Sequence, residues 1–235
     1  MIAVPSKFPG FPPEAREFLG DLKRNNTREW FTPRKPVFED KVKGPMSELV
    51  LSLGEAMREF APELNADPKK AIYRIYRDVR FSNDKSPYKT WIAAVFSPRG
   101  LGKHAAAGAY FHMSPEEILV GGGVYAPGPG ELLAIRNHIA GHAAQFRALL
   151  KERAFRRCFG EVTGETLKRA PKGFAKDDPA VDLLRHKQFL AMNRLPPEIA
   201  ETPKLYSEIA KSFRAMMPFL RFLNSPLKPP QIQSP

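Results

Sequence analysis

The side chains best suited to bind an anion are concentrated between Arg74 and Lys89. Residues 69–89 include seven Lys or Arg and two Asp, a local excess of five positive charges. Guanidinium and ammonium groups hold phosphate and carboxylate oxygens through charge-assisted hydrogen bonds. The segment therefore predicts an anion-binding site. Its candidate ligand-binding residues are Arg74, Arg77, Arg80, Lys85, Tyr88 and Lys89.

Arg77 occupies an unusual position in this segment. Apolar and polar residues alternate between 73 and 81, which is typical of a half-buried strand, and Arg77 falls on the apolar row. A guanidinium placed there needs a partner, because burying an unpaired charge is costly. The partner is either a carboxylate of the protein core or the phosphate or carboxylate of a ligand. The sequence leaves both alternatives open.

Three residues could move a proton if the site is catalytic: Asp78, Asp84 and His112. Asp78 shares the polar face of the predicted strand with two arginines, so we expect it to stay ionised and to orient them. Asp84 can close a turn through its side chain, either as a purely architectural residue or in a rigid loop that presents cations to a phosphate. His112 lies on the same strand face as Tyr110 and is the histidine best placed for acid–base chemistry, although a structural role would also account for it.

The same segment resembles a known protein family. It has an Arg-Asp-x-Arg-Phe-Ser pattern at 77–82, followed by Asp-Lys at 84–85 and Pro-Tyr-Lys at 87–89. Together with Asn25-Asn26, Glu29-Trp30-Phe31 and residues 167–173, this pattern is similar to that of the bacterial and fungal domain-of-unknown-function 2461 family. The resemblance covers about residues 8–223. It implies a single intracellular α+β domain and marks these positions without assigning a reaction.

Other motifs give weaker signals. Gly121–Gly123 lacks the G-x-G-x-x-G spacing of a dinucleotide site and indicates either tight helix packing or a shallow binding trough. His138 and His142 share a helix face, but the Glu of H-E-x-x-H is missing and the sequence offers no third ligand, so no metal site is predicted. Cys158 stands in a stretch with aromatic residues at helical spacing, which favours packing over a reactive thiol. We expect no cofactor.

Hydrophobic periodicity predicts the elements that position these residues. Helical spacing extends over 13–24, over 38–60 with a break at Pro45, and over 130–151 and 205–223. Strands are predicted at 73–81, 90–97, 106–113, 118–126 and 187–193. The predicted fold class is α+β, a mainly antiparallel sheet of about five strands with N- and C-terminal helices packed on it. We expect an extended lead-in over 1–12, a single domain over 13–224 and a proline-rich mobile tail over 225–235.

The charge of the chain favours an anionic partner. Its 235 residues include 37 Lys or Arg and 25 Asp or Glu, a net charge of +12. Nucleic acid and phosphate-bearing small molecules both fit this excess, which can also be simply a solvated surface. A second basic stretch, residues 147–176, would extend a nucleic-acid footprint if it lies beside residues 69–89. Tyr76, Tyr88 and Trp91 would then stack on bases, unless they belong to the core.

The location and the function follow as expectations. A single cysteine, and apolar runs too short for a signal peptide or a membrane span, predict a cytoplasmic protein with no membrane association. The leading hypothesis is an anion-binding domain, with nucleic acid first among the ligand classes. The second is an enzyme acting on a phosphorylated or carboxylated small molecule, which a closed pocket would favour. The third is a structural or interaction protein, which full internal pairing of Arg77 would favour.

Overall fold

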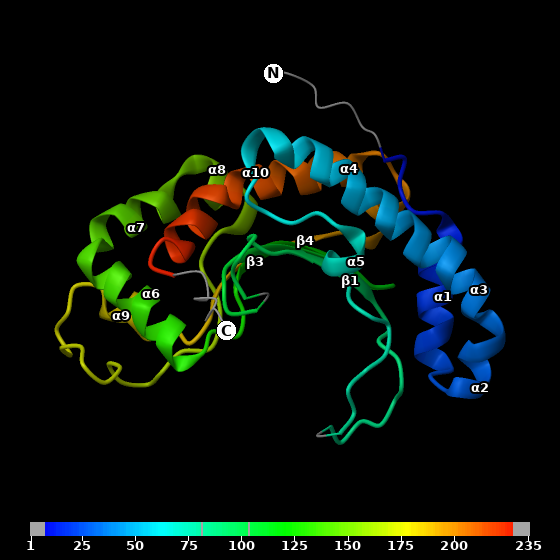
Figure 1. Cartoon of the computed structure of the whole chain (residues 1–235), viewed down its shortest axis with the longest axis horizontal. Coiled ribbons are helices and arrows are strands. Elements are labelled where there is room, and N and C mark those ends of the chain that lie inside the picture. Colours follow the sequence, from blue (N-terminus) through cyan, green and yellow to red (C-terminus); the bar gives the residue numbers. More distant parts are fainter. Residues whose placement is uncertain (1–7, 81, 103, 228–235) are drawn as a thin grey trace, which may run out of the picture. The chain divides into compact units, whose positions relative to one another are not determined.

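The computed structural model describes residues 8–80, 82–102 and 104–227 and contains helices together with one antiparallel sheet (Figure 1). Within these residues the sheet has four strands in the order β1-β2-β3-β4. The α+β class is therefore confirmed, whereas the fifth predicted strand, at 73–81, is wrong. The strands are β1 (Ile92–Phe96), β2 (Gly108–Met113), β3 (Ile118–Val124) and β4 (Phe189–Leu195).

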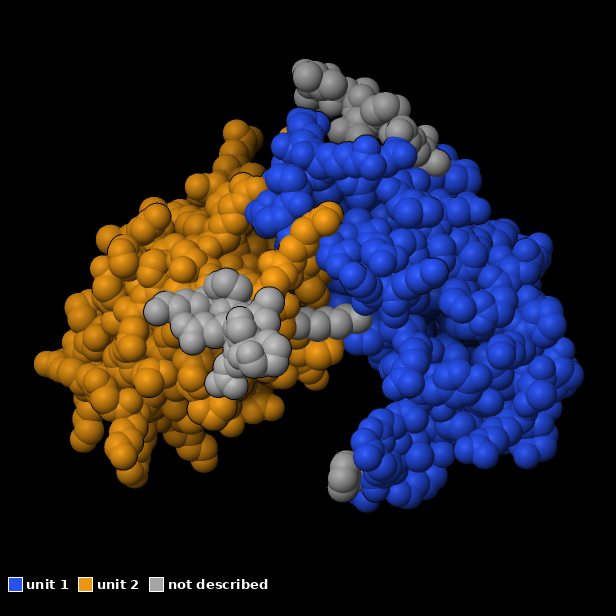
Figure 2. Space-filling model, viewed as in Figure 1, with its two compact units in different colours: residues 1–95, 110–120, 194–211 blue, residues 96–109, 121–193, 212–235 orange. Residues whose placement is uncertain are grey.

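The described residues form two compact units, which Figure 2 colours separately. Unit 1 contains the chain up to residue 95 together with 110–120 and 194–211, and unit 2 contains 96–109, 121–193 and the chain from 212. Every strand of the sheet therefore contributes residues to both units. A single domain over 13–224 stays a prediction.

The segment predicted as a strand at 73–81 is extended but is not part of the sheet. In its described part, ladder pairing is limited to the isolated bridges Ile72↔Ala94 and Tyr76↔Tyr88. Three residues lie between the two bridges on one side and five on the other, so the register changes between them. Beyond Tyr88, Pro87 accepts a hydrogen bond from the Arg77 N–H (2.9 Å) but has no N–H to return it. The change of register and the missing N–H of Pro87 stop the ladder. The side chains still alternate between less and more exposed from residue 73 to 80, as predicted. Phe81 lies outside the described residues.

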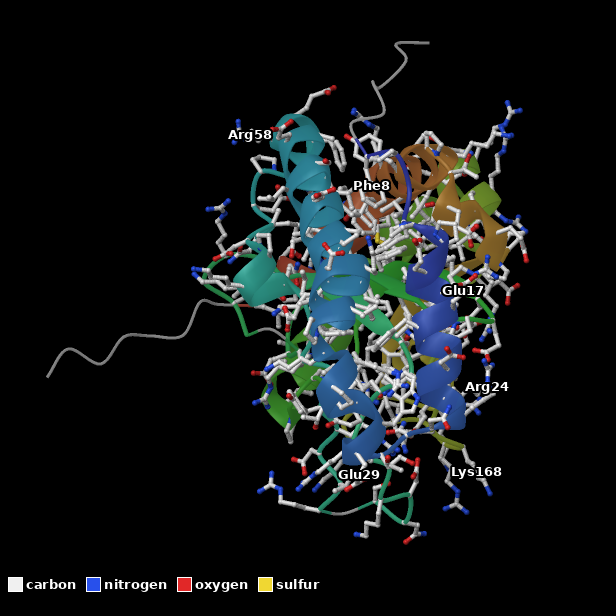
Figure 3. The ribbon with its side chains drawn as sticks, turned by 90° about the vertical axis from the view of Figure 1, so that its right-hand side faces the viewer. Phe8, Glu17, Arg24, Glu29, Arg58 and Lys168 are labelled. Carbon is white, nitrogen blue, oxygen red and sulfur yellow. The ribbon has the colours of Figure 1, made fainter. Side chains whose placement is uncertain are left out.

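Unit 1 is built around a set of N-terminal helices. Helix α1 (Pro13–Arg24) ends at Asn25, and Thr27 caps α2 (Arg28–Phe31) by accepting a hydrogen bond from the Trp30 N–H. A helical stretch follows, and its last part begins one residue before Pro45, as the predicted break requires. It runs side by side with α1 (Figures 1 and 3). Its parts are η1 (Thr32–Arg34), α3 (Lys35–Val37), the π-helix η2 (Phe38–Lys43) and α4 (Gly44–Phe60), and the unit also holds α5 (Pro68–Ala71) and η3 (Pro197–Glu201).

Aromatic side chains form the core of unit 1. The Phe18 ring packs against the rings of Phe31 and Phe38, so α1, α2 and η2 share one apolar cluster. Phe11 stacks on Phe111 of β2 and is almost completely buried. The part of the predicted lead-in that the structure describes, residues 8–12, therefore packs into the core. Residues 1–7 of the lead-in and 228–235 of the predicted tail lie outside the described residues.

The regular structure of unit 2 is mainly helical. The helical spacing over 130–151 corresponds to two helices, α6 (Pro129–Gly141) and α7 (Ala143–Lys151), which meet at His142. The Phe146 ring of α7 stacks on those of Phe219 and Phe222 in α10 (Lys204–Asn224), which begins in unit 1 and ends in unit 2. The remaining helices are α8 (Arg153–Phe159) and α9 (Val181–Leu184).

The glycines at 121–123 allow close packing of strands. A Cβ at Gly121 would lie 2.3 Å from the Ala191 carbonyl oxygen of β4. A Cβ at Gly122 would lie 2.3 Å from the Gly108 carbonyl oxygen of β2, and one at Gly123 only 1.9 Å from that of Phe189. Backbone atoms of the neighbouring strands fill the space that side chains would take, and at Gly122 the Met216 sulfur of α10 also lies 2.9 Å from the added Cβ. Close packing, mainly against strands and at Gly122 also against a helix, therefore explains these glycines. Among the described residues, no helix is both long and apolar enough to cross a membrane.

Candidate functional site

The basic segment forms a long loop between α5 and β1. It projects beyond the helices of unit 1 in both ribbon views (Figures 1 and 3). The isolated bridge Tyr76↔Tyr88 closes its base, and the Lys89 N–H donates to the Ile75 carbonyl (2.7 Å). The loop therefore has a fixed base from which its charged side chains extend.

A pocket of about 550 Å³ lies at this base, within unit 1. Its volume falls within the range of small-ligand sites. The lining combines three cations, two carboxylates, two aromatic rings and three other polar side chains. These are Lys23, Arg77 and Lys89; Asp78 and Asp84; Tyr88 and Trp91; and Asn26, Ser86 and Thr90.

The pocket divides the candidate residues of the sequence into two groups. Arg77, Tyr88 and Lys89 line it, as do both candidate carboxylates. Arg74, Arg80 and Lys85 lie outside the lining and are exposed. Sequence reasoning missed Lys23, Ser86 and Thr90 as site residues, and it noted Asn26 only as part of the family pattern. Lys23 comes from α1, and no local pattern connects it to a loop more than fifty residues away.

Arg77 finds its partner within the chain. Its guanidinium forms an ion pair with Asp84, and a second nitrogen lies 3.5 Å from the Ser82 hydroxyl oxygen. These contacts use two of its five N–H groups. The Arg77 side chain is 26% exposed and that of Asp84 is 59% exposed, so the partner is a surface carboxylate and not a core one.

Asp84 is held firmly in place on the other side. One of its oxygens accepts hydrogen bonds from the Ser86 N–H (2.9 Å) and from the Ser86 hydroxyl (2.6 Å), which closes an Asx turn. These bonds, followed by the bond from Arg77, hold the pKa of the Asp84 carboxyl well below its usual range. Asp84 is therefore an ionised anchor that fixes the direction of Arg77.

Asp78 and Arg80 form a second pair on the same loop. The Arg80 Nε and one terminal nitrogen donate to the two oxygens of Asp78 (3.0 and 2.7 Å), and the Arg80 N–H also donates to it. These bonds lower the pKa of Asp78 to about 2. Both side chains are largely exposed, so solvent screens the pair and leaves it weak.

The two lysines of the loop bind backbone carbonyls. Lys85 Nζ donates to the Val79 carbonyl (3.0 Å). Lys89 Nζ donates to the carbonyls of Arg74 (2.5 Å) and Tyr76 (3.3 Å), and it lies 5.3 Å from the centre of the Trp91 ring. Lys89 thus connects the two sides of the loop base and also brings a positive charge to the pocket.

The wall of the pocket opposite the loop comes from the connection between α1 and α2. The Asn26 side chain donates to the Tyr88 carbonyl (2.9 Å) and accepts from the Tyr88 N–H (3.1 Å). The Tyr88 ring is buried and stacks on Phe31 of α2, with ring centres 4.1 Å apart. Lys23, at the end of α1, forms an ion pair with Glu116 (2.7 Å) of the turn between β2 and β3. Two segments far apart in the sequence therefore line one pocket, and Glu116 from a third segment contacts one of its cations.

His112 lies behind Trp91. Its ring stacks on the indole (4.9 Å between centres), and its Nδ1 is 3.1 Å from the Tyr110 hydroxyl oxygen. Burial, and to a lesser extent the charge of Arg194, lowers the pKa of His112 to about 4. The imidazole is neutral at pH 7. It supports a wall of the pocket and lies outside the lining itself.

Comparison with known proteins identifies the family. The family model described as conserved hypothetical protein (DUF2461) matches residues 14–222. The chain belongs to the DUF2461 family. The matched residues include every residue of the pocket lining, so the pocket is part of the DUF2461 domain. Searches of curated proteins and of solved structures give no match.

Unit 2 contains the other residues that the sequence singled out. The second basic stretch, residues 147–176, belongs to this unit, and its Arg147 forms an ion pair with Asp182 (2.6 Å). The rings of His138 and His142 are 4.4 Å apart, and His138 Nε2 is hydrogen bonded to the Ser225 hydroxyl (2.8 Å). In the part of the chain that is described, no group of three His, Cys, Asp or Glu side chains could hold a metal. The candidate site is therefore the pocket at the base of the loop, in unit 1.

Proposed function

We propose that the protein binds a phosphate-bearing ligand in the pocket at the base of the loop. The observation that carries the proposal is the convergence on one pocket of Lys23 from α1 and of Arg77 and Lys89 from the two sides of the loop. Arg77 is directed by Asp84 and keeps further N–H groups beyond the two contacts described above. A fork of donors that is oriented in advance suits phosphate oxygens.

The phosphate has two potential sources, a nucleic acid or a small phosphorylated molecule. The exposed cations around the pocket, Arg74, Arg80 and Lys85, would suit the backbone of a nucleic acid. The aromatic residues give less support to a nucleic acid, since Tyr88 is buried and the Trp91 ring already stacks on His112 and has Lys89 Nζ 5.3 Å from its centre. Among the described aromatic residues of the loop, Tyr76 is the most exposed, at 51%, and is accessible for stacking.

Binding is better supported than catalysis. Asp78 and Asp84 are held in the ionised form by their hydrogen bonds, and His112 is buried and neutral. A group that transfers protons efficiently at neutral pH has a pKa near 7, and these three groups lie well below that value. The enzyme alternative therefore draws no support from them.

The ion pairs Arg77–Asp84 and Arg80–Asp78 also favour a second candidate function, a purely structural network. In that case the loop charges would stabilise one another, and substitution of the cations would leave the affinity for phosphate-bearing ligands unchanged. The two candidates differ in a single measurable property, the affinity of the loop for phosphate.

The test is a salt titration with labelled oligonucleotides. Fluorescence anisotropy would measure the binding of single-stranded and duplex DNA and RNA between low and physiological salt, with inorganic phosphate and a nucleoside monophosphate as competitors. The variants are Arg77→Gln for the pocket and Arg80→Ala with Lys85→Ala for the loop. The double variant Lys43→Ala with Lys211→Ala is the matched control, because it removes the same charge from exposed ion pairs within single helices.

We expect Arg77→Gln to weaken every phosphate-bearing ligand. If the ligand is a nucleic acid, the double loop variant also flattens the salt slope, by about one unit for each lost phosphate contact. If it is a small molecule, the loop variant has little effect and the small competitors bind directly. The absence of binding to all of these probes at low salt, or equal losses in the control variant, would overturn the proposal and leave the structural network.

A further inference from the structure

Each cation of the pocket already has an acceptor within the chain. Lys23 contacts Glu116, Arg77 contacts Asp84, and Lys89 Nζ contacts two backbone carbonyls. A ligand can bind the N–H groups of Arg77 that Asp84 and Ser82 leave over, but it must compete with Glu116 for Lys23. A weakly charged anion competes poorly with a carboxylate, even though the lining has more cations than carboxylates.

The Lys23–Glu116 contact is the one most easily exchanged. Both side chains are about half exposed (55% and 56%), and each belongs to a residue at the surface. An exposed ion pair of this kind contributes little to stability, because solvent and salt compete for both charges. Lys23 can therefore turn from Glu116 to a ligand at small cost. Asp84 is different, since Ser86 holds its other oxygen in place.

The three cations of the pocket suit a terminal phosphate better than a phosphodiester. A phosphodiester carries one negative charge on two free oxygens, whereas a terminal phosphate carries about −1.5 to −2 at pH 7 and offers three acceptor oxygens. Three cations that approach from α1, from the start of the loop and from its end match three oxygens. A terminal phosphate also has the additional charge required to displace Glu116 from Lys23.

We propose that the pocket selects a terminal phosphate, a phosphomonoester, over a phosphodiester or a carboxylate. This inference rests on the proposed function and specifies its ligand: a small phosphomonoester or a nucleic acid with a phosphorylated end. Lys23 and Arg77 are the residues that determine the selectivity. Glu116 holds Lys23 when no ligand is bound and weakens binding by competing for it.

The experiment compares ligands that differ only in the form of the phosphate. One pair is a nucleoside 5′-monophosphate and the corresponding cyclic 3′,5′-phosphate, and the other is one oligonucleotide with a 5′-phosphate or a 5′-hydroxyl. Calorimetric titration would measure the first pair and anisotropy the second. We expect the monoester to bind at least tenfold more tightly than its partner. Lys23→Gln and Arg77→Gln should each reduce this preference to about twofold, while Lys43→Gln should preserve it.

A gain of affinity separates selectivity from misfolding. Glu116→Gln keeps the size of the side chain and releases Lys23, so the affinity for the monoester should rise several-fold while that for the diester changes little. Equal affinities for monoester and diester, or a loss of affinity in Glu116→Gln, would overturn this inference and leave the proposed function intact. Failure of every phosphate-bearing probe to bind would overturn both. A preference for the 5′-phosphorylated oligonucleotide over the monophosphate would identify a nucleic-acid end as the ligand.

Discussion

Asn26 and Tyr88 are joined by two hydrogen bonds, in which the Asn26 side chain binds both the carbonyl and the N–H of Tyr88. The amide of Asn26 thus pairs with the loop backbone as a neighbouring strand would. The two bonds tie the connection between α1 and α2 to the base of the basic loop, 62 residues further along the chain. Lys23 lies at the end of α1, next to the first of these segments, and Arg77 belongs to the second. Both line the pocket, so the shape of the pocket depends on these bonds.

Replacing Asn26 should therefore loosen the loop. Asn26→Ala leaves a partly buried N–H and C=O of Tyr88 without partners, which costs about 1–3 kcal/mol of unfolding free energy. Urea unfolding would measure this loss, and hydrogen exchange should show faster exchange at the Tyr88 amide. Asn25→Ala is the matched control, because the Asn25 side chain makes only an exposed bond to the end of α1. Equal effects of the two substitutions would contradict the role assigned to Asn26.

Asp84→Asn tests the charge of the Arg77–Asp84 pair. The new amide can still accept the Ser86 N–H, so the turn of the loop should persist. Removing a negative charge from the pocket lining should strengthen the binding of phosphate a few-fold, whereas Arg77→Gln should weaken it. Binding to a labelled phosphate ligand, with thermal unfolding as the check on folding, would measure both. If the two substitutions weaken binding alike, the pair acts as one structural unit.

Much of the fold follows from local patterns in the sequence. Strands β1 to β4 and helices α1 and α10 lie where hydrophobic periodicity places them, because each has a regular apolar face or a continuous apolar run. The segment at 73–81 also alternates, but pairing depends on the partner strand. There, Pro87 lacks the N–H that a ladder requires. Alternation thus predicted correctly which side chains are exposed, and wrongly that the segment is a strand.

The site was predictable only in part. Charge and turn chemistry indicated Arg77, Asp84 and Lys89, all within one short stretch of chain. Lys23 was not predictable, because its position depends on how α1 packs against α2 and on the bond of Asn26 to Tyr88. The partner of Arg77 could not be chosen from the sequence either. A carboxylate seven residues away becomes its partner only when the loop folds back on itself.

The buried imidazole of His112 should make stability depend on pH. Its pKa in the folded protein, about 4, lies below the ordinary value of 6.5. Between these two values the unfolded chain binds a proton that the folded protein does not, so stability falls as the pH decreases from 6.5 to 4 and is fully present above 6.5. The loss is on the order of 3 kcal/mol. Urea unfolding at a series of pH values should give a shallower dependence for His112→Gln than for the wild type, and identical slopes would exclude His112 as the cause.

Gly123 should tolerate no side chain. Its φ is +129°, a conformation that L side chains rarely adopt, and an added Cβ would lie 1.9 Å from the Phe189 carbonyl oxygen. Gly123→Ala therefore forces β3 away from β4 and should cost more than about 3 kcal/mol, enough to prevent folding in a marginally stable chain. Gly130→Ala is the control, because its Cβ would meet nothing within 4 Å at the start of α6. That substitution should leave stability unchanged or raise it by up to about 1 kcal/mol. Thermal unfolding of the two variants would show the contrast, and a folded Gly123→Ala protein with a wild-type midpoint would mean that β3 and β4 are not packed as closely as described here.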